Sequence, residues 1–231
     1  MFLGVHVSIS GNIADSVTRA QKLGCSAMQI FSRNPRSWRQ TKIKEEDCAE
    51  FKRCVKESNV KAVAVHVPYL INLATPFDGL YKRSIEAYID DLYETASLGA
   101  QFLVTHMGSF KHSTFNNGLD RFIKALDVIF SETKKLQVRL LLENTSGSGS
   151  WLGYSFNHHK MIFDKVKDNS KLGVCLDTAH AFAAGIDLRK QEIFDSLIDG
   201  ISKDLGEDAL KVIHLNDSMS DLNSKIDRHE H

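Results

Sequence analysis

The sequence predicts an α/β fold of the TIM (β/α)8-barrel type, with seven strands visible and the eighth βα unit missing. Short apolar runs alternate with longer amphipathic segments along the whole chain, which is typical of a parallel sheet covered by helices. Five of the apolar runs also end in a histidine or an acidic residue, at intervals of 34 to 40 residues. A strand with its crossover helix takes about 30 residues or more, so each ending falls one βα unit after the last.

The individual elements follow from the same patterns. Apolar runs predict strands near 2–8, 27–32, 62–67, 102–107, 139–143, 172–177 and 211–215. Helices are predicted between them, near 12–24, 45–58, 79–98, 118–136, 156–169 and 187–205. The segment from Tyr81 to Leu98 shows the helical signal well, because its apolar residues recur every three to four positions. Glycines that end helices follow three of these segments, at Gly24, Gly99 and Gly206.

Composition limits the class of protein. With 231 residues, 42% of them hydrophobic, the chain can bury one sizeable core, and we expect a single barrel domain over residues 1–231, incomplete at its C-terminus. The first strand begins almost at the N-terminus and no apolar run approaches the roughly 20 residues of a membrane span, so we expect a cytoplasmic protein. The four cysteines show no paired spacing and are expected to be free thiols. The 29 basic and 29 acidic residues exclude a generally basic, nucleic-acid-coating protein but allow a local basic cleft.

Side chains that can bind a metal stand at the predicted strand ends. In a parallel α/β barrel all strand C-termini open onto one face, so these residues should meet there. They are His66, His106, Glu143, Asp177 and His214. A lone histidine at a strand end more often serves packing, but independent structural uses would not favour one face. Mixed histidine and carboxylate ligands suit zinc, and also manganese or iron, and the lack of cysteine among them favours a catalytic site.

Two further clusters add candidate ligands. Asp177 is followed three residues later by His180, which we expect in the loop after the strand. Near the C-terminus, Asp227 and His229 stand two residues apart, and in an extended segment such residues project the same way. The alternative for this terminus is a solvated charged tail. Eight candidate ligands exceed what one ion accepts, so two or three ions that share carboxylates are expected.

The chain closely resembles the endonuclease IV family of apurinic/apyrimidinic DNA repair enzymes, within the xylose-isomerase-like barrel superfamily. The resemblance runs from the first strand to the last residue, and its order and spacing are specific. Its carriers are Gly4–Ser8, Phe31–Trp38, His66–Leu73, His106–Ser109, Leu142–Thr145, Leu176–His180, His214–Ser218 and Asp227–His229.

This resemblance implies a zinc-dependent endonuclease that cuts double-stranded DNA 5′ to an abasic site, leaving a 3′-hydroxyl and a 5′-deoxyribose phosphate. Three zinc ions are implied, although Mn²⁺ or Fe²⁺ suit the same ligands. The first would be held by His66, His106 and Glu143. The second would be held by Glu143, Asp177, His214 and a further glutamate from the eighth strand. The third would be held by His180, Asp227 and His229, and Glu143 is implied as the catalytic residue that bridges the first two ions.

The resemblance also implies residues that contact DNA. Arg36, Tyr69 and Leu70 match family positions that enter the duplex and fill the space left by the missing base. An aromatic ring and an apolar wedge can stack on neighbouring base pairs, and arginine can contact a groove or a phosphate. Read without the resemblance, Tyr69 and Leu70 would be ordinary loop packing after a strand. We expect the protein to be a monomer. Its expected partner is double-stranded DNA that contains abasic sites, and we expect no binding to membranes.

The sequence departs from the family pattern at its end, because the chain stops at His231, directly after the third ligand cluster. The eighth strand and its glutamate are absent, so the activity of this chain is an open question. Two alternatives therefore stand beside the nuclease. One is a metal-dependent sugar isomerase or epimerase of the same superfamily, which Glu143, Asp177 and His214 would also suit. The other is a catalytically impaired fragment that binds DNA or zinc.

Overall fold

The residues that the structure describes form a sheet of seven strands, which are arranged in the order in which they occur along the chain. The computed structural model describes residues 1–39 and 42–230. The strands are β1 (Gly4–His6), β2 (Ala27–Phe31), β3 (Ala62–His66), β4 (Phe102–His106), β5 (Arg139–Glu143), β6 (Leu172–Asp177) and β7 (Leu210–His214), in the order β1-β2-β3-β4-β5-β6-β7. The pairs from β1 to β4 and from β5 to β7 are parallel. This confirms the predicted fold class, and all seven strands lie where the sequence places them.

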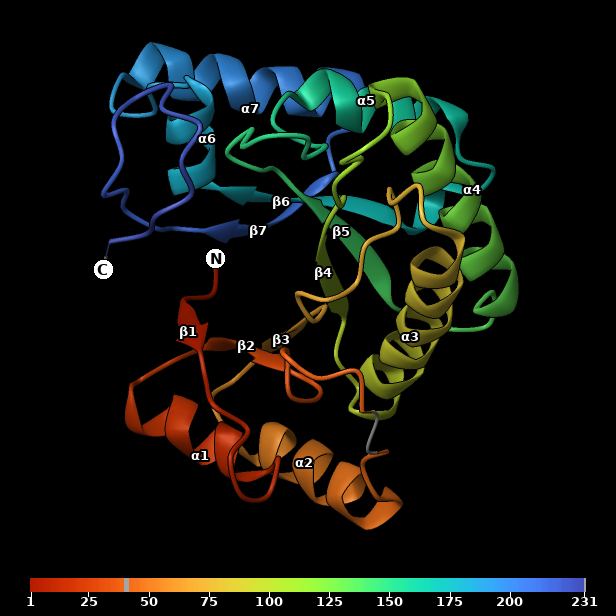
Figure 1. The fold of residues 1–231 in the computed structure, drawn as a ribbon. Helices are drawn as coiled ribbons and strands as arrows, with labels where there is room; N and C mark the ends of the chain where they lie inside the picture. Colours follow the sequence, from red (N-terminus) through yellow and green to blue (C-terminus); the bar gives the residue numbers. More distant parts are fainter. Residues whose placement is uncertain (40–41, 231) are drawn as a thin grey trace. The chain divides into compact units, whose positions relative to one another are not determined.

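The helices of the described residues are α1 (Asp15–Lys22), α2 (Glu45–Glu57), α3 (Asp78–Ser97), α4 (Phe115–Glu132), α5 (Phe156–Lys165), α6 (Thr178–Ala184) and α7 (Gln191–Leu205), with one 3-10 turn at Asn169–Lys171. Six of them correspond to predicted helices, with ends that differ by a few residues. The helix expected near 187–205 begins only at Gln191, and the one expected near 118–136 begins earlier, at Phe115, and ends at Glu132. Figure 1 shows how the helices alternate with the strands along the chain.

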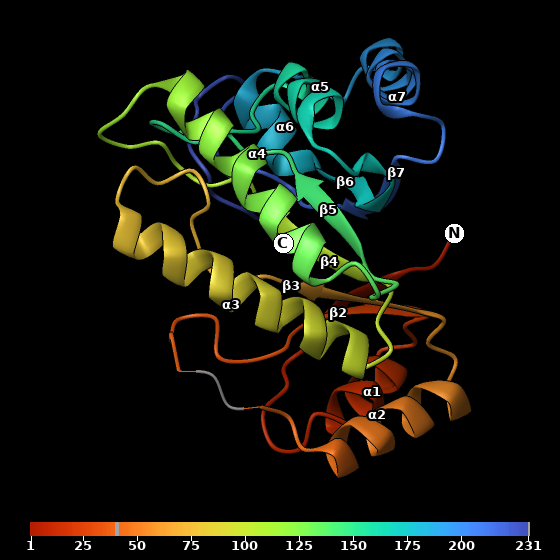
Figure 2. The same ribbon diagram turned by 90° about the vertical axis from the view of Figure 1, so that its right-hand side faces the viewer.

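The chain divides into two compact units. The first comprises Met1–Ile71, Glu86–Val104 and Glu132–Arg139. In it, α1 packs against both β2 and α2, as Figures 1 and 2 show. The buried apolar side chains of this unit come from strands, helices and a helix end alike, and they include Ile30, Phe51, Val65, Tyr88, Leu98 and Leu103. This unit carries β1 to β3 and most of β4.

The second unit comprises Asn72–Ile85, Thr105–Ser131 and Leu140–His231. Here α5 contacts α7, and α6 contacts the strand that precedes it, β6. All six residues of β6 are buried, as expected for a strand in a parallel sheet that is covered on both faces. The apolar face of α4 and the middle of β5 supply much of the core: Leu119, Phe122, Leu126, Ile129, Leu140 and Leu141.

Helix α6 corrects one prediction, because the sequence placed His180 in a loop. The seven residues Thr178–Ala184 form a helix instead, and His180 belongs to its first turn. Asp177 caps this helix: its side chain accepts a hydrogen bond from the His180 N–H at 2.8 Å. The helix ends at Gly185, whose φ of 108° is left-handed. A helix of two turns leaves too short an apolar pattern to be recognised from sequence.

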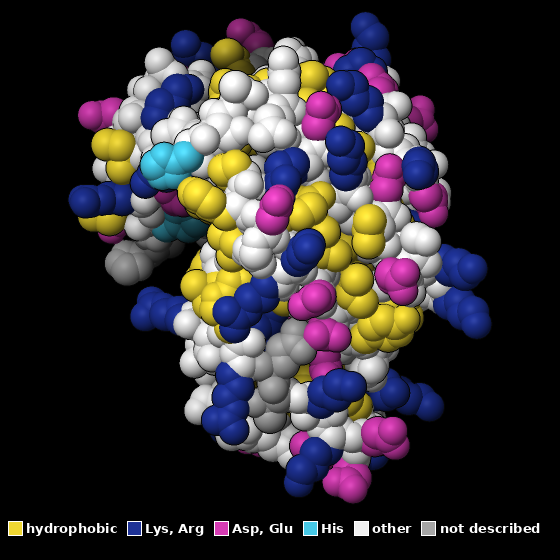
Figure 3. Space-filling view, turned by 45° about the vertical axis from the view of Figure 1, so that its right-hand side comes forward, with side chains coloured by type: hydrophobic (Ala, Val, Ile, Leu, Met, Phe, Trp, Pro, Cys, Tyr) yellow, Lys and Arg dark blue, Asp and Glu magenta, His cyan; other side chains and the backbone are white. Residues whose placement is uncertain are grey.

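Charges of both signs are interspersed over the face drawn in Figure 3, as the equal numbers of basic and acidic residues suggest. Within residues 1–39 and 42–230, no helix combines the length and the apolar character needed to cross a bilayer.

Candidate metal centre

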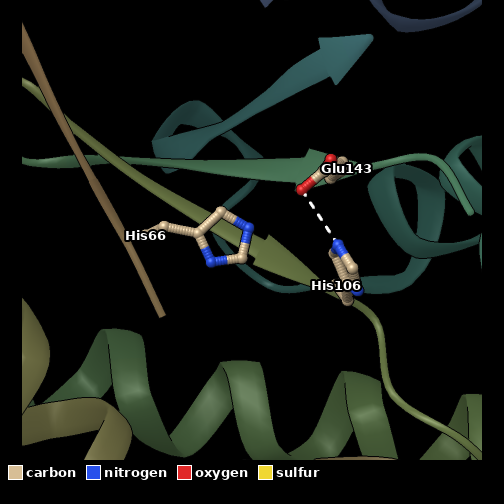
Figure 4. Close-up of side chains that lie close together, drawn as sticks. All are labelled: His66, His106 and Glu143. Carbon is tan, nitrogen blue, oxygen red and sulfur yellow. Dashed lines mark ion pairs between the residues drawn. The ribbon is translucent and has the colours of Figure 1, made fainter. Parts of the chain in front are cut away.

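Glu143 is the centre of a buried cluster in the second unit. It ends β5, and its carboxylate is 2% exposed. His106, at the end of β4, places its Nε2 3.1 Å from Glu143 Oε2, as Figure 4 shows. His214, at the end of β7, places its Nδ1 2.9 Å from Glu143 Oε1. Three strand ends that are far apart in the sequence therefore meet on one carboxylate.

The charge of Glu143 is stabilised by these neighbours. Burial by itself raises the pKa of the Glu143 carboxyl, but the charges and hydrogen bonds of His106 and His214 outweigh burial and hold it well below its usual range. Burial lowers the pKa of His214, and the attraction of Glu143 and Asp177 reverses this, so the net shift is upward. The centre therefore holds a carboxylate anion at neutral pH and favours positive charge beside it.

Asp177 is the second buried carboxylate and is held from both sides. Its backbone N–H donates to Asn144 Oδ1 at 2.7 Å, and the Asn144 side-chain amide donates back to Asp177 O at 2.9 Å. Asn216 Nδ2 donates to Asp177 Oδ2 at 2.6 Å. His214 Nδ1 lies 3.8 Å from the same oxygen, which links Asp177 to the Glu143 cluster. Such partners fix the orientation of a carboxylate that binds a cation.

His180, Asp227 and His229 form the third group of the cluster. His180 Nε2 is 3.3 Å from Asp227 Oδ2, and His229 Nε2 is 3.2 Å from Asp227 Oδ1. The two Nε2 atoms of His180 and His229 lie 3.2 Å apart. The C-terminal segment that carries Asp227 and His229 is thus folded back onto α6, and it is no free charged tail.

The electrostatics of this group also favour a cation. Burial lowers the pKa of His180, but the hydrogen bond to Asp227 and the carboxylates of Asp177 and Glu143 raise it to about 9. Hydrogen bonds from His180 and His229 lower the pKa of Asp227. The hydrogen bond with Asp227 raises the pKa of His229. A proton or a metal ion would both be stabilised here, and they compete for the same atoms.

The spacing of these donor atoms is compatible with a tetrahedral metal site. In a tetrahedral site with bonds of about 2.0–2.1 Å, the ligand atoms stand about 3.3–3.4 Å from one another. The Nε2 atoms of His180 and His229 lie 3.2 Å apart, and they lie 3.3 and 3.2 Å from Oδ2 and Oδ1 of Asp227 respectively. Moreover, His180 Nδ1 lies 2.8 Å from the carbonyl oxygen of Asn144, which can only accept, so Nδ1 carries a proton and Nε2 is the nitrogen at which a metal ion would replace a proton. This Nε2 faces both a histidine nitrogen and a carboxylate oxygen, an arrangement that a shared cation stabilises.

Cys175 also lies near Glu143 and His214, since it is paired in register with Glu143. Burial, together with the nearby carboxylates of Glu143 and Asp177, raises the pKa of this thiol well above its ordinary value. A thiol that resists deprotonation is a poor metal ligand. Cys25, Cys48, Cys54 and Cys175 are all free, as the sequence predicts.

His66 belongs to the first unit, where it ends β3 and is 6% exposed. Its Nδ1 lies 2.8 Å from the carbonyl oxygen of Val67, so this nitrogen is the donor and Nε2 carries the lone pair. The ring packs edge-on to Phe31 with centroids 5.7 Å apart. In the pairing of β3 with β4, His66 is level with Val104, which precedes His106 by two residues. Figure 4 draws the three side chains of the predicted first zinc site.

The predicted DNA contacts lie in the first unit, on the loops after β2 and β3. Tyr69 is 60% exposed, and its ring packs edge-on to Phe31 with centroids 5.5 Å apart. Its backbone N–H donates to the Pro35 carbonyl oxygen at 3.2 Å, which ties the two loops together. Arg36 is exposed and Leu70 is partly exposed. An exposed aromatic ring on a rigid aromatic support is available for stacking.

Three residues that shape these sites were missed by the sequence reasoning. Asn144 directly follows Glu143 and holds both Asp177 and His180, so a polar residue one position after a strand-end ligand was a usable signal. Trp151 lies edge-on to His106 with centroids 5.9 Å apart. In the first unit, Asp91 binds Arg33. The last two contacts join residues 45 to 58 positions apart and leave no local signal.

Comparisons with known proteins identify the family of the chain. Residues 17–231 match the family described as xylose isomerase-like TIM barrel. A probable endonuclease 4 of Halothermothrix orenii is 42% identical over 231 residues, covering 100% of this chain and 83% of the relative. One from Methanosphaerula palustris is 40% identical, covering 99% and 81%.

Solved structures extend the likeness. The crystal structure of endonuclease IV from Thermus thermophilus superposes with a TM-score of 0.83 at 32% identity, covering 99% of this chain and 82% of that one. The 3-keto-D-glucoside 4-epimerase YcjR of E. coli superposes with a TM-score of 0.65 at 11% identity, covering 90% and 77%, and shares the fold alone. The chain therefore belongs to the endonuclease IV family of xylose isomerase-like TIM barrels.

Proposed function

We propose that the protein is a zinc-dependent DNA repair endonuclease. It hydrolyses the phosphodiester 5′ to an abasic site in duplex DNA and leaves a 3′-hydroxyl and a 5′-deoxyribose phosphate. The observation that carries this proposal is the network that joins seven of the eight predicted ligands within one unit: His106, Glu143, Asp177, His180, His214, Asp227 and His229. The names of relatives at 40–42% identity support the reaction class.

The ligands divide naturally among three ions. Glu143 would be shared between a first ion, with His106 and His66, and a second ion, with Asp177 and His214. Three observations support His66 as a ligand. Its ring is buried, its Nδ1 is engaged with the Val67 carbonyl oxygen so that Nε2 is left to bind a metal, and it is paired in the sheet with Val104, two residues before His106.

The third ion would be held by His180, Asp227 and His229. Bound zinc would supply two things, a bound water of pKa about 7 and compensation for charge on the phosphate oxygens.

The remaining chemistry belongs to the chain itself. Glu143 supplies a buried negative charge whose two oxygens already face different histidines, which suits a bridging ligand. Asn216 keeps the Asp177 carboxylate from rotating, because its side-chain amide donates to Oδ2, whereas Asn144 fixes the backbone of Asp177 by bonding its N–H and its carbonyl oxygen. The Asn144 carbonyl also sets the tautomer of His180. Fixed ligands lower the reorganisation required when charge develops on the substrate.

Recognition of the lesion rests on the loops after β2 and β3. An abasic nucleotide has lost its own stacking and pairing, so turning it out of the duplex costs less than turning out a normal one. Tyr69 and Leu70 would fill the vacated space, and Arg36 would contact the backbone or a groove. Tyr69 suits this task because it is exposed and yet supported by Phe31.

A sugar isomerase or epimerase is the less favoured function. The solved epimerases and epimerase-like proteins that superpose on this chain share 11–15% of its sequence, which shows a common fold only. The cluster of His180, Asp227 and His229 exceeds the needs of one divalent ion that activates a sugar. The endonuclease accounts for all of these ligands.

The test is a nicking assay on a duplex that carries one abasic site. The purified protein should cut that duplex once and leave an intact duplex untouched. Chelation should abolish cutting, and zinc should restore it. Glu143→Gln should lower the cleavage rate by more than about 100-fold, since even groups that only orient ligands are worth about 10- to 100-fold.

The matched control is Glu207→Gln, at an exposed position before β7. It makes the same chemical change away from the centre and should cut at the normal rate. Circular dichroism of both variants checks that they fold. Cutting by Glu143→Gln at near-normal rate would contradict its role. Epimerisation of a ketose without any nicking would overturn the nuclease.

A further inference from the structure

The segment that delivers two ligands of the third group has little regular structure of its own. Asp227 and His229 follow β7 in a stretch whose pairing is one isolated antiparallel bridge between Ser218 and His229. Residues 223–229 are here called the ligand strap. Contacts with other segments must hold this strap in place. Without them, the entropy cost of ordering the loop would oppose the positions that Asp227 and His229 adopt.

The C-terminus of α6 provides that support. The last carbonyl groups of a helix have no partner within the helix. In α6 these groups accept hydrogen bonds from the strap: Asn223 N–H donates to Phe182 O at 3.1 Å, and Lys225 N–H donates to Ala183 O at 3.0 Å. The ammonium group of Lys225 donates to Ala184 O at 2.6 Å. The strap thus donates to three successive carbonyl groups, although Phe182 O also accepts from the Gly185 N–H at 3.0 Å.

The backbone of the strap is strained at the same points. Asn223 has a φ of 62° and Lys225 a φ of 60°, both left-handed. Asparagine tolerates this conformation, but for lysine it costs energy that the surroundings must offset. The surroundings are specific, since the Lys225 ammonium lies 5.7 Å from the centre of the Tyr154 ring as well as on Ala184 O. Backbone strain that the surrounding contacts retain in this way is typical of positions whose conformation is needed for function.

Lys225 donates a hydrogen bond to the last residue of α6, which is also the helix that carries His180. Lys225 contacts its C-terminus, and two residues later Asp227 contacts His180 in its first turn. The strap is therefore attached to α6 at both of these points, while its far end is also held by the bridge between Ser218 and His229. Helix α6 thus links the Lys225 contact to the contact between Asp227 and His180. If the bond from Lys225 to Ala184 O is lost, Asp227 and His229 should be less well placed relative to His180.

We propose that Lys225 is a positioning residue that clamps the ligand strap to the C-terminus of α6 and so fixes Asp227 and His229 on His180. This proposal rests on the proposed function in one respect, namely that these three side chains hold a metal ion. The ammonium of Lys225 contacts Ala184 O and the Tyr154 ring, so its role would be exerted through Asp227 and His229 and not as a ligand.

The test compares Lys225→Met with Lys225→Arg. Methionine keeps an unbranched stem but removes the cation, whereas arginine keeps a donor for Ala184 O. Lys203→Met, at an exposed position on α7, is the matched control. Zinc is titrated into metal-stripped protein against a chelator of known affinity. Lys225→Met should weaken one zinc equivalent about 10-fold and leave the others unchanged, as expected for a group that orients ligands. Lys225→Arg and Lys203→Met should bind zinc as the unsubstituted protein does.

A second substitution identifies which equivalent is affected. His229→Ala should weaken the same zinc, and adding Lys225→Met to it should cause little further loss. Unchanged zinc binding by Lys225→Met, an equal loss at every site, or additive losses in the double variant would each overturn the proposal.

Amide hydrogen exchange of the metal-free protein provides a readout that is independent of zinc. Lys225→Met should speed exchange at the amides of Asn223 and Lys225, and Lys225→Arg should not. Equal exchange in the two variants overturns the clamp. Failure of the unsubstituted protein to take up zinc would contradict the proposed function, whereas the exchange result would still decide whether Lys225 holds the strap.

Discussion

The buried ion pair between Arg33 and Asp91 offers the sharpest test of how the first unit is held together. Arg33 follows β2, and Asp91 lies on α3. The guanidinium binds both carboxylate oxygens, with Nε to Oδ1 and Nη2 to Oδ2 each at 2.9 Å. Arg33 Nη1 also donates to Ser37 O at 3.3 Å, which closes the loop that presents Arg36. The side chains are only 7% and 1% exposed.

The expected cost of breaking this pair follows from its burial. Removing one partner leaves an uncompensated buried charge, which typically costs about 3–5 kcal/mol. Asp91→Leu and Arg33→Met should each lower the free energy of unfolding by that amount, a large share of an ordinary total of about 5–15 kcal/mol. Replacing both partners should cost far less than the sum. The pKa of Asp91 agrees, because burial raises it and Arg33 lowers it without reversing the shift. Desolvation therefore offsets much of the attraction.

The assay is urea denaturation at pH 7 of the two single variants and of the double variant Arg33→Met with Asp91→Leu. The pair is a coupled unit if the double variant is more stable than either single variant. Losses below about 1 kcal/mol in the single variants, or a double loss equal to their sum, would refute the reasoning, since surface pairs behave in that way.

Two further predictions concern one residue in each unit. His159 is fully buried against Phe156, and burial lowers its pKa to about 4. Above pH 6.5 the residue is neutral in both the folded and the unfolded protein, so protonation takes nothing from the stability there. About 3 kcal/mol of that stability should be lost as pH falls from 6.5 to 4, because the unfolded chain then binds the proton and the folded chain does not. His159→Phe should flatten the unfolding free energy over this range, and parallel curves would exclude the assignment. Tyr69→Ala should raise the dissociation constant for abasic duplex about 10- to 100-fold, from lost stacking of about 1–3 kcal/mol. The unfolding free energy should barely change, with exposed Tyr93→Ala as control, and unchanged affinity would make Tyr69 a packing residue only.

The position of the metal ligands was readable from sequence for a local reason. Each strand is a short apolar run, and its last residue is identifiable without knowledge of what surrounds it. Parallel strands then carry their C-termini to one edge, so His106, Glu143 and His214 were expected together, and within the second unit they meet. The pairing of Asp227 with His229 was predicted in the same way, from a spacing of two.

Other features needed the folded chain. Helix α6 was missed because two turns leave no clear period, and its cap from Asp177 is recognisable only once the helix is present. The Arg33–Asp91 pair was missed because nothing local connects residues 58 positions apart. A left-handed lysine at position 225 has no signature at all, since lysine is not a residue that predicts this conformation.

By itself, the sequence determined the order of strands and helices, the residues at each strand end and the family to which they belong. Those properties depend on hydrophobic periodicity and on short motifs, which are encoded within a few neighbouring residues. Tertiary structure alone decided what orients the ligands: Asn144 on Asp177 and His180, and Lys225 on the end of α6. These contacts join residues 33 to 41 positions apart, and they form only when packing brings each donor to an amide or carbonyl oxygen that is distant in the sequence.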